Sequence, residues 1–328
     1  MNDLMYPWHQ PYWEHLSAYV KQQRIPQVLL IKGRGGLGKQ QLALHFAQFL
    51  MCSERQENAA CHTCESCRLF IANTHPDFMM LQPEELGKAI GVDLVRRLIA
   101  KLALKPQYSG YRVVLVNPAE AMNRNAANAF LKCLEEPPER TLFLLVAELS
   151  QQLPATVISR CQMLLLVSPV AVIARQWLQA QGVAEQQQVP LLNLAQGAPL
   201  LALKYAQESR LEQYHICFDD WKNILIRKDC PVTAAEKWLK FPETQLLQWL
   251  ISWTEDLIKC HFQVAPALLL NENFHKDLTN LAQRVDLKKL FNFYGLLLKD
   301  TYRIQTQLNK QLLFEEVLIT WSQSTRYY

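Results

Sequence analysis

Residues 27–51 read QVLLIKGRGGLGKQQLALHFAQFLM, and this stretch decides the fold. The apolar run at 27–33 predicts a buried strand, and a glycine-rich turn follows it. Residues 39–51 place apolar side chains at helical spacing, which predicts a helix with one buried side. A strand, a glycine-rich loop and a helix in this order indicate the start of an α/β fold with a phosphate loop.

The same alternation continues along the first half of the chain. Further apolar runs predict strands at 77–81, 112–116, 141–147 and 162–167, with helices at 92–104 and 119–136 between them. Pro137 and Pro138 end the second of these helices. Continuous apolar strands that alternate with helices predict a parallel sheet covered on both faces, over residues 1–167.

The second half of the chain shows helical patterns only. Residues 168–207 predict a small three-helix lid, broken near Gly182 and Gly197. Residues 208–328 are rich in Leu and Trp and predict a helical bundle, with helices at 246–258 and 287–308 among them. The Leu and Trp side chains suit either a subunit interface or the core of the bundle.

Composition restricts the class of protein. The 328 residues are 50% hydrophobic and 20% charged, which predicts two or three folded domains and excludes a disordered chain. The net charge of +4 neither requires nor excludes a nucleic-acid partner. No apolar run is long enough to span a membrane, and the first ten residues lack a signal-peptide pattern. We therefore expect a cytoplasmic protein with reduced thiols.

The phosphate loop matches the pattern G-x-x-x-x-G-K through Gly33, Gly38 and Lys39. Glycines let backbone amides surround a phosphate, while the helix N-terminus and the lysine add positive charge. The next position should be Ser or Thr, whose hydroxyl binds magnesium, but it is Gln40.

The second magnesium position is also altered. A phosphate-loop protein that hydrolyses ATP has Asp, usually followed by Glu, directly after the strand that corresponds to 112–116. This chain has Asn117 and Pro118 there. Glu120 follows two residues later and could come closer only through a shift of one turn. Three interpretations remain: a vestigial loop, nucleotide binding without turnover, and active hydrolysis. The altered residues favour the first.

Cys52, Cys61, Cys64 and Cys67 form a C-x8-C-x2-C-x2-C pattern. Four thiolates within sixteen residues suit a tetrahedral zinc ion, and because all four positions are cysteine, the site should be structural rather than catalytic. The alternative is four reduced cysteines without metal.

Residues 154–161, PATVISRC, place Arg160 between a short helical turn and the last strand. By residue type alone, a surface arginine in a salt bridge is the simpler interpretation. A planar guanidinium also suits a phosphate held by another chain.

These motifs occur together in one order. They are the phosphate loop, the four cysteines, IGVDLVRRL at 90–98, NAANAFLKCLEEPPE at 125–139, LFLLVA at 142–147 and LPATVISRC at 153–161. Over residues 1–207 the chain resembles the bacterial clamp-loader branch of the AAA+ family. The resemblance implies an AAA+ domain, a helical lid and a C-terminal collar domain that holds a five-membered ring together.

Two kinds of subunit within this branch compete for the assignment. The ATP-hydrolysing motor subunits (gamma/tau) carry a magnesium Ser or Thr, an Asp-Glu pair, a polar residue after the fourth strand and an arginine in the lid. This chain has Gln40, Asn117-Pro118, Ala147-Glu148 and residues 197–200 (GAPL) in those places. It is thus similar to the non-catalytic subunits of the branch.

The resemblance implies partners and a role for Arg160. The chain would join gamma/tau motor subunits and a delta subunit, and act with the sliding clamp and primed DNA of DNA polymerase III. Arg160 would serve as an arginine finger for the ATP of the adjacent motor subunit. ATP would not be hydrolysed by this chain, whose loop leaves nucleotide binding open.

Contacts with DNA would involve backbone phosphates, which carry little sequence information. Candidate residues are Arg96, Arg97, Lys101, Arg124 and Lys132, although solvated helix faces explain them equally well. Two other functions remain as alternatives: a motor subunit of the gamma/tau type, and a zinc-bearing nucleic-acid-binding protein outside replication.

Overall fold

The computed structural model describes residues 5–85, 87–108, 110–304 and 309–325. The chain forms two compact units. The first runs to Gly182 and includes Ala195–Leu203, and the second contains Val183–Leu194 and the chain from Lys204 onward. Among the described residues, none of the helices has the length and apolar content that a membrane crossing requires.

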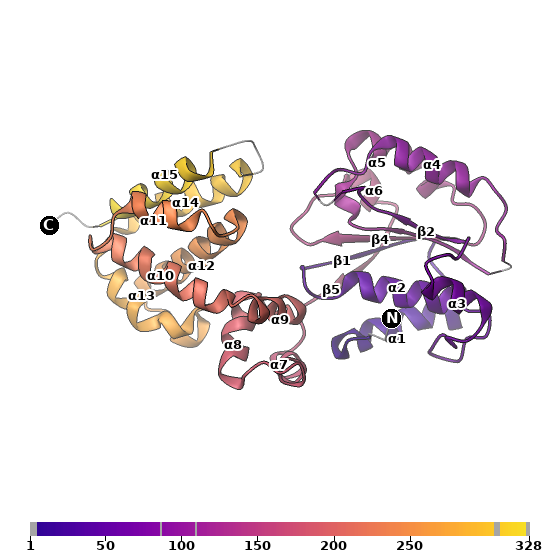
Figure 1. Ribbon diagram of the computed structural model, residues 1–328, viewed down its shortest axis with the longest axis horizontal. Coiled ribbons are helices and arrows are strands. Elements are labelled where there is room, and N and C mark those ends of the chain that lie inside the picture. The colour runs from indigo at the N-terminus through magenta and orange to yellow at the C-terminus, as the bar shows by residue number, and fades with distance from the viewer. Residues whose placement is uncertain (1–4, 86, 109, 305–308, 326–328) are drawn as a thin grey trace. The chain divides into compact units, whose positions relative to one another are not determined.

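A five-stranded parallel sheet forms the centre of the first unit (Figure 1). The strands are β1 (Val28–Gly33), β2 (Phe78–Leu81), β3 (Arg112–Val116), β4 (Thr141–Glu148) and β5 (Gln162–Leu166). Their order is β2-β3-β4-β1-β5, and every neighbouring pair is parallel. The predicted sheet is confirmed, and the strand bounds agree with the sequence pattern to within one residue.

Helices cover both faces of this sheet. Figure 1 shows α1 (Gln10–Lys21), α2 (Lys39–Met51) and α3 (Glu65–Ile71) on one face, and α4 (Val92–Leu102), α5 (Arg124–Glu135) and α6 (Ala155–Ile158) on the other. Strand β1 shows why residues on both faces of the sheet are apolar. Its Leu29 packs with Phe46 of α2, whereas Leu30 packs with Phe130 of α5.

The predicted single helix at 119–136 was wrong. A 3₁₀ turn at Ala119–Ala121 is followed by extended chain, where Met122 pairs with Ile90. Helix α5 begins only at Arg124, because the Asn123 side chain accepts a hydrogen bond from a backbone N–H of its first turn.

Three helices occupy the segment at 168–207, as its pattern predicts. They are α7 (Ala171–Ala180), α8 (Glu185–Leu194) and α9 (Pro199–Gln207). Helix α7 belongs to the first compact unit and α8 to the second, while α9 begins in the first and ends in the second. The division into domains at 1–167, 168–207 and 208–328 therefore stays a prediction.

The remainder of the chain is helical. Its helices are α10 (Arg210–Leu225), α11 (Pro231–Trp238), α12 (Glu243–His261), α13 (His275–Ala282), α14 (Leu287–Arg303) and α15 (Lys310–Ser322), with 3₁₀ turns at Pro266–Leu268 and Glu272–Phe274. The sequence pattern extends the α14 helix to residue 308, but residues 305–308 lie outside the described residues.

Tryptophans fill the core of this helical unit. Trp221, Trp238, Trp253 and Trp321 are fully buried there. The rings of Trp221 and Trp321 stack with centroids 4.1 Å apart, and the Trp321 indole N–H donates to the Trp221 carbonyl at 2.8 Å. These side chains therefore serve core packing.

Replacing Trp221 by alanine should lower the free energy of unfolding of the helical unit by about 3–5 kcal/mol, since it removes a buried indole and leaves a cavity. Urea denaturation followed by circular dichroism measures this change. Ile319→Ala, at a partly exposed position of α15, is the control and should cost no more than about 0.5 kcal/mol. Equal losses for the two variants would contradict the assigned core.

Candidate functional site

The phosphate loop has the backbone that its sequence predicts. It connects β1 directly to α2, which begins at Lys39. Gly36 and Gly38 have φ values of +77° and +79°, a left-handed conformation that glycine adopts without strain. A Cβ on Gly33 would lie 2.7 Å from the Leu166 carbonyl oxygen, so the neighbouring strand leaves no room for a side chain.

The loop lysine is held inside the protein. The Lys39 ammonium donates to the Arg34 carbonyl at 2.8 Å and pairs with the Glu148 carboxylate at 3.0 Å. Only 7% of the Lys39 side chain is exposed, whereas 40% of the Glu148 side chain is. Glu148 ends β4, beside the loop. The loop lysine therefore already has an anionic partner within the chain.

Glu120 lines the same pocket as Gln40 and Asn117. Its Oε1 accepts a hydrogen bond from the Glu148 backbone N–H at 3.0 Å. Its Oε2 is buried and has no hydrogen-bond partner among the described residues, so a place for Glu120 near the magnesium position stays a prediction. The bond to Oε1 holds the backbone of Glu148, and Glu148 is the residue whose side chain pairs with Lys39.

Aromatic residues from the N-terminal segment also pack against the loop, at Leu37 and Gly38. The Leu37 carbonyl accepts hydrogen bonds from the Trp8 indole N–H at 2.9 Å and from the His9 Nε2–H at 2.8 Å. Burial lowers the pKa of His9, which keeps the imidazole neutral. The Tyr6 ring stacks on Trp8 and lies against Gly38.

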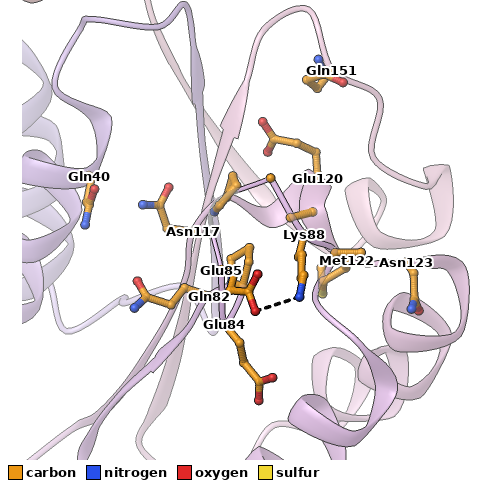
Figure 2. Close-up of a pocket in the computed structure, with 15 residues that line it drawn as sticks. Gln40, Gln82, Glu84, Glu85, Lys88, Asn117, Glu120, Met122, Asn123 and Gln151 are labelled. Carbon is orange, nitrogen blue, oxygen red and sulfur yellow. Dashed lines mark ion pairs between the residues drawn. The ribbon is translucent and has the colours of Figure 1, made fainter. Parts of the chain in front are cut away.

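An open pocket of about 920 Å³ lies at the carboxyl edge of the sheet (Figure 2). Gln40 and Asn117, which occupy the two magnesium positions of a hydrolytic loop, both line it. Both side chains are neutral amides. Figure 2 also shows the ion pair between Glu85 and Lys88 on the pocket wall, 2.8 Å between the charged atoms. At these two positions the chain therefore lacks the hydroxyl and the carboxylate that hold magnesium in such loops, while the carboxylates of Glu84, Glu85 and Glu120 line other parts of the pocket.

Arg160 lies at the surface between α6 and β5, with 33% of its side chain exposed. Its guanidinium pairs with Glu135, at the end of α5, and donates to the Thr156 carbonyl at 2.8 Å and the Ser159 hydroxyl at 3.3 Å. These bonds use the two terminal nitrogens of a group that has five N–H donors. The salt bridge that residue type alone suggests is present.

The four cysteines come together between α2 and α3. Their sulfur atoms all lie within 4.8 Å of one another. Three of the sulfur–sulfur separations are Cys52–Cys61 at 3.5 Å, Cys52–Cys64 at 3.8 Å and Cys61–Cys67 at 4.0 Å. A tetrahedral zinc ion with Zn–S bonds of about 2.3 Å requires sulfur atoms about 3.8 Å apart. The cluster therefore fits such an ion.

Backbone amides support these sulfur atoms. Three N–H groups donate to them, from Cys61 to Cys52 at 3.3 Å, from Cys64 to Cys61 at 3.3 Å and from Cys67 to Cys64 at 3.4 Å. Burial opposes ionisation of Cys64, but hydrogen bonds from Ser53 and the Cys67 backbone outweigh it and lower its pKa to about 5. Such bonds favour the thiolate form of Cys61 and Cys64 that a metal ion requires, whereas burial raises the pKa of Cys52 and Cys67.

The candidate DNA-contacting residues lie on two helices that pack together. Arg96, Arg97 and Lys101 lie on α4, and Arg124 and Lys132 lie on α5. All five are at least partly exposed, and the first two form ion pairs with acidic side chains of the same chain. Exposure and ion pairs of this kind are those of a solvated helix surface.

Sequence reasoning missed two parts of the site. The position of Glu148 could have been inferred from the sequence, because it follows an apolar run predicted as a strand, and the carboxyl end of that strand lies at the same edge of the sheet as the phosphate loop. No sequence pattern indicates the roles of Trp8 and His9, since the Leu37 carbonyl that they contact lies 29 and 28 residues further along the chain.

Comparison with known proteins gives matches over nearly the whole chain. Residues 8–169 match the family described as "DNA polymerase III, delta subunit", and residues 208–323 match "DNA polymerase III, delta subunit, C terminal". The protein named DNA polymerase III subunit delta' from Pseudomonas aeruginosa is 33% identical over 322 residues, covering 97% of each chain. The protein of the same name from Haemophilus influenzae is 36% identical and the match covers 79% of each chain. That from Escherichia coli is 29% identical, and the match covers 96% of this chain and 94% of that one.

Among solved structures, a DNA polymerase III gamma subunit-related protein from Thermotoga maritima aligns with a TM-score of 0.48 and 20% identity. The alignment covers 96% of this chain and 99% of that one.

Proposed function

Because the chain belongs to the family of DNA polymerase III delta' subunits, we propose that it is a non-catalytic subunit of the replicative clamp loader. Family membership confirms the resemblance drawn from the motifs. The observation that carries the proposal is the match to a delta' subunit over 97% of both chains. In this role the chain helps to hold the ring that loads the sliding clamp on primed DNA.

The loop residues support a subunit that does not hydrolyse ATP. Phosphoryl transfer depends on metal ions and on positioning, and Gln40 and Asn117 offer amides where a hydroxyl and a carboxylate are needed. Lys39 is also held by Glu148 at 3.0 Å. The competing function is a gamma/tau-type motor, which magnesium-dependent turnover by the isolated chain would support.

Arg160 is the residue through which the chain takes part in catalysis. It would reach the ATP of the adjacent motor subunit and stabilise charge on the transferred phosphoryl group. Its partial exposure and its remaining N–H donors support this role. The arginine finger is thus supplied in trans by a chain that does not itself turn over nucleotide.

The cysteine cluster is proposed to hold a structural zinc ion. Four sulfur ligands leave no open coordination position for substrate, and the sulfur separations suit a tetrahedral ion. The ion would connect the end of α2 to the start of α3, through Cys52 and Cys67. It would therefore stabilise the insertion rather than take part in ATP chemistry.

The second half of the chain is proposed to contain the lid, at 168–207, and the collar, at 208–328. Exposed apolar residues repeat along α14 at Phe291, Leu298 and Tyr302. Spacings of seven and four residues place them on one helix face, which supports a subunit contact there. The partners are gamma/tau motor subunits, the delta subunit, the clamp and primed DNA, and the location is the cytoplasm.

Reconstitution tests this function. Purified chain should co-elute with gamma/tau and delta subunits in gel filtration, and clamp loading on primed DNA should depend on its presence. The isolated chain should show no magnesium-dependent ATPase activity above background. Tight, salt-sensitive DNA binding by the chain alone, with no affinity for motor subunits, would instead indicate a nucleic-acid-binding protein outside replication.

A further inference from the structure

A carboxylate of the chain itself lies against the phosphate loop. A Cβ built on Gly35 would be 3.4 Å from Glu148 Oε2 and 3.5 Å from Oε1, so the carboxylate lies beside the loop at this glycine. The same group pairs with the Lys39 ammonium at 3.0 Å. We propose that Glu148 is a built-in anion that occupies the phosphate position of this loop and closes it to phosphate-containing ligands.

The loop is built to attract an anion. Its turn leads into the N-terminus of α2, where free backbone N–H groups and the helix dipole favour negative charge. Lys39 adds a full charge with 7% of its side chain exposed. A lysine so deeply buried requires a partner, because an unpaired buried charge is costly. Glu148 supplies that partner without any ligand.

The sheet fixes Glu148 in this place. In the parallel pairing of β1 with β4, Glu148 lies opposite Gly33, the first residue of the loop motif. Its backbone N–H donates to Glu120 at 3.0 Å, and the next N–H, from Leu149, donates to the Gly33 carbonyl at 2.9 Å. The internal anion is therefore preorganised, whereas a free phosphate would have to lose translational freedom to compete with it.

The space around the loop is filled as well. A Cβ on Gly36 would meet the Leu201 side chain at 2.6 Å, and one on Gly38 would meet the Tyr6 ring at 2.7 Å. The face of Glu148 toward solvent remains open, with 40% of the side chain exposed. A small anion can therefore approach once the carboxylate is removed, so inorganic pyrophosphate is a better probe than a nucleotide.

Isothermal titration of pyrophosphate, with EDTA present, tests the proposal. Glu148→Ala removes both the charge and the bulk of the carboxylate, and should bind pyrophosphate at least about tenfold more tightly than the wild type, since juxtaposed like charges cost several kcal/mol. Glu148→Gln removes the charge alone and should show a smaller gain. The double variant Glu148→Ala/Lys39→Met should lose the gain, because the loop then lacks its cation.

Glu139→Ala is the matched control. It removes an exposed carboxylate of the same unit and changes the net charge equally, so it should leave pyrophosphate affinity unchanged. Circular dichroism checks that each variant is folded; if Glu148→Ala is not, Glu148→Gln retains an oxygen that can accept from Lys39 and carries the comparison. Affinity unchanged in the folded Glu148 variants, or raised equally by Glu139→Ala, would overturn the proposal.

The inference rests on the proposed function only in assigning no ATP turnover to this loop, and the two can fail separately. Magnesium-dependent ATP hydrolysis by the wild-type chain alone would overturn the non-catalytic assignment. Pyrophosphate binding to the wild type as tight as to Glu148→Ala, without turnover, would overturn only the role given to Glu148.

Discussion

Replacing Arg160 by alanine is expected to lower ATP turnover by the assembled clamp loader and to impair clamp loading. An arginine finger contributes about 10³–10⁵ in rate at the site that it serves. The total rate should fall by less if the several ATP sites of the ring fire independently. The measurement is the steady-state ATPase rate of the loader with clamp and primed DNA, in which this chain is either the wild type or the Arg160→Ala variant.

Two controls separate catalysis from assembly. Arg160→Ala must still co-elute with the other subunits, because a loss of the complex would lower the rate for a different reason. Arg160→Lys keeps the charge but loses the planar fork, so it should recover little of the rate. If the rate is unchanged in an intact Arg160→Ala complex, Arg160 is structural and only the assembly role survives.

The ion pair of Arg160 with Glu135 is compatible with this role. A guanidinium has five N–H donors, and the contacts within the chain use only its two terminal nitrogens. Glu135 and the Thr156 carbonyl would therefore hold one edge of the group while another edge stays available to a phosphate from the neighbouring subunit. A residue with 33% of its side chain exposed needs such contacts to keep one orientation.

The sheet could be predicted almost to the residue because parallel strands covered on both faces are continuous apolar runs. In β1, neighbouring residues pack into different cores, Leu29 on the α2 side and Leu30 on the α5 side. The first four residues of β1 are all apolar, and Lys32 and Gly33 follow them at the start of the loop, so the strand is visible in the sequence. The loop and the helix after it could be predicted for a related reason, since the glycines mark the turn.

Contacts between distant segments could not be predicted. The break at Met122 depends on its pairing with Ile90, which the local helical pattern does not show. The packing of the N-terminal segment on the loop depends on Trp8 and His9, whose side chains donate to the Leu37 carbonyl far along the chain. In each case the deciding interaction is a hydrogen bond to a backbone group. The residue types of the two segments do not show which backbone group this is.

The cysteine cluster, unlike these long-range contacts, could be predicted, because short spacing and residue type together indicate its chemistry. Two C-x-x-C steps bring three sulfur atoms close through local turns, and Cys52 joins them from the end of α2. The amide of Cys67 donates to Cys64 at the start of α3, so the turn and the helix cap are one feature. Because the cluster is local in this way, its residue types and spacing are enough to indicate a metal site.

Replacing Cys61 and Cys64 together by serine is therefore expected to remove zinc and to unfold the segment between α2 and α3. Structural zinc sites contribute apparent binding energies of about 10–16 kcal/mol in isolated zinc-finger peptides at neutral pH, and much of this energy supports folding. Metal analysis by mass spectrometry should find about one zinc per wild-type chain and none in the variant. Limited proteolysis should cut the variant between residues 52 and 67.

Cys230→Ser is the matched control, because Cys230 is exposed and lies in the helical unit. It should keep both the zinc and the protease resistance of the wild type. Zinc binding should also weaken as the pH falls, since protons compete with the metal for the thiolates. A wild-type chain without zinc, or a double serine variant that keeps it, would leave four reduced cysteines as the correct interpretation. The segment would then depend on its N–H to sulfur bonds and on the burial of Cys52, Cys64 and Cys67.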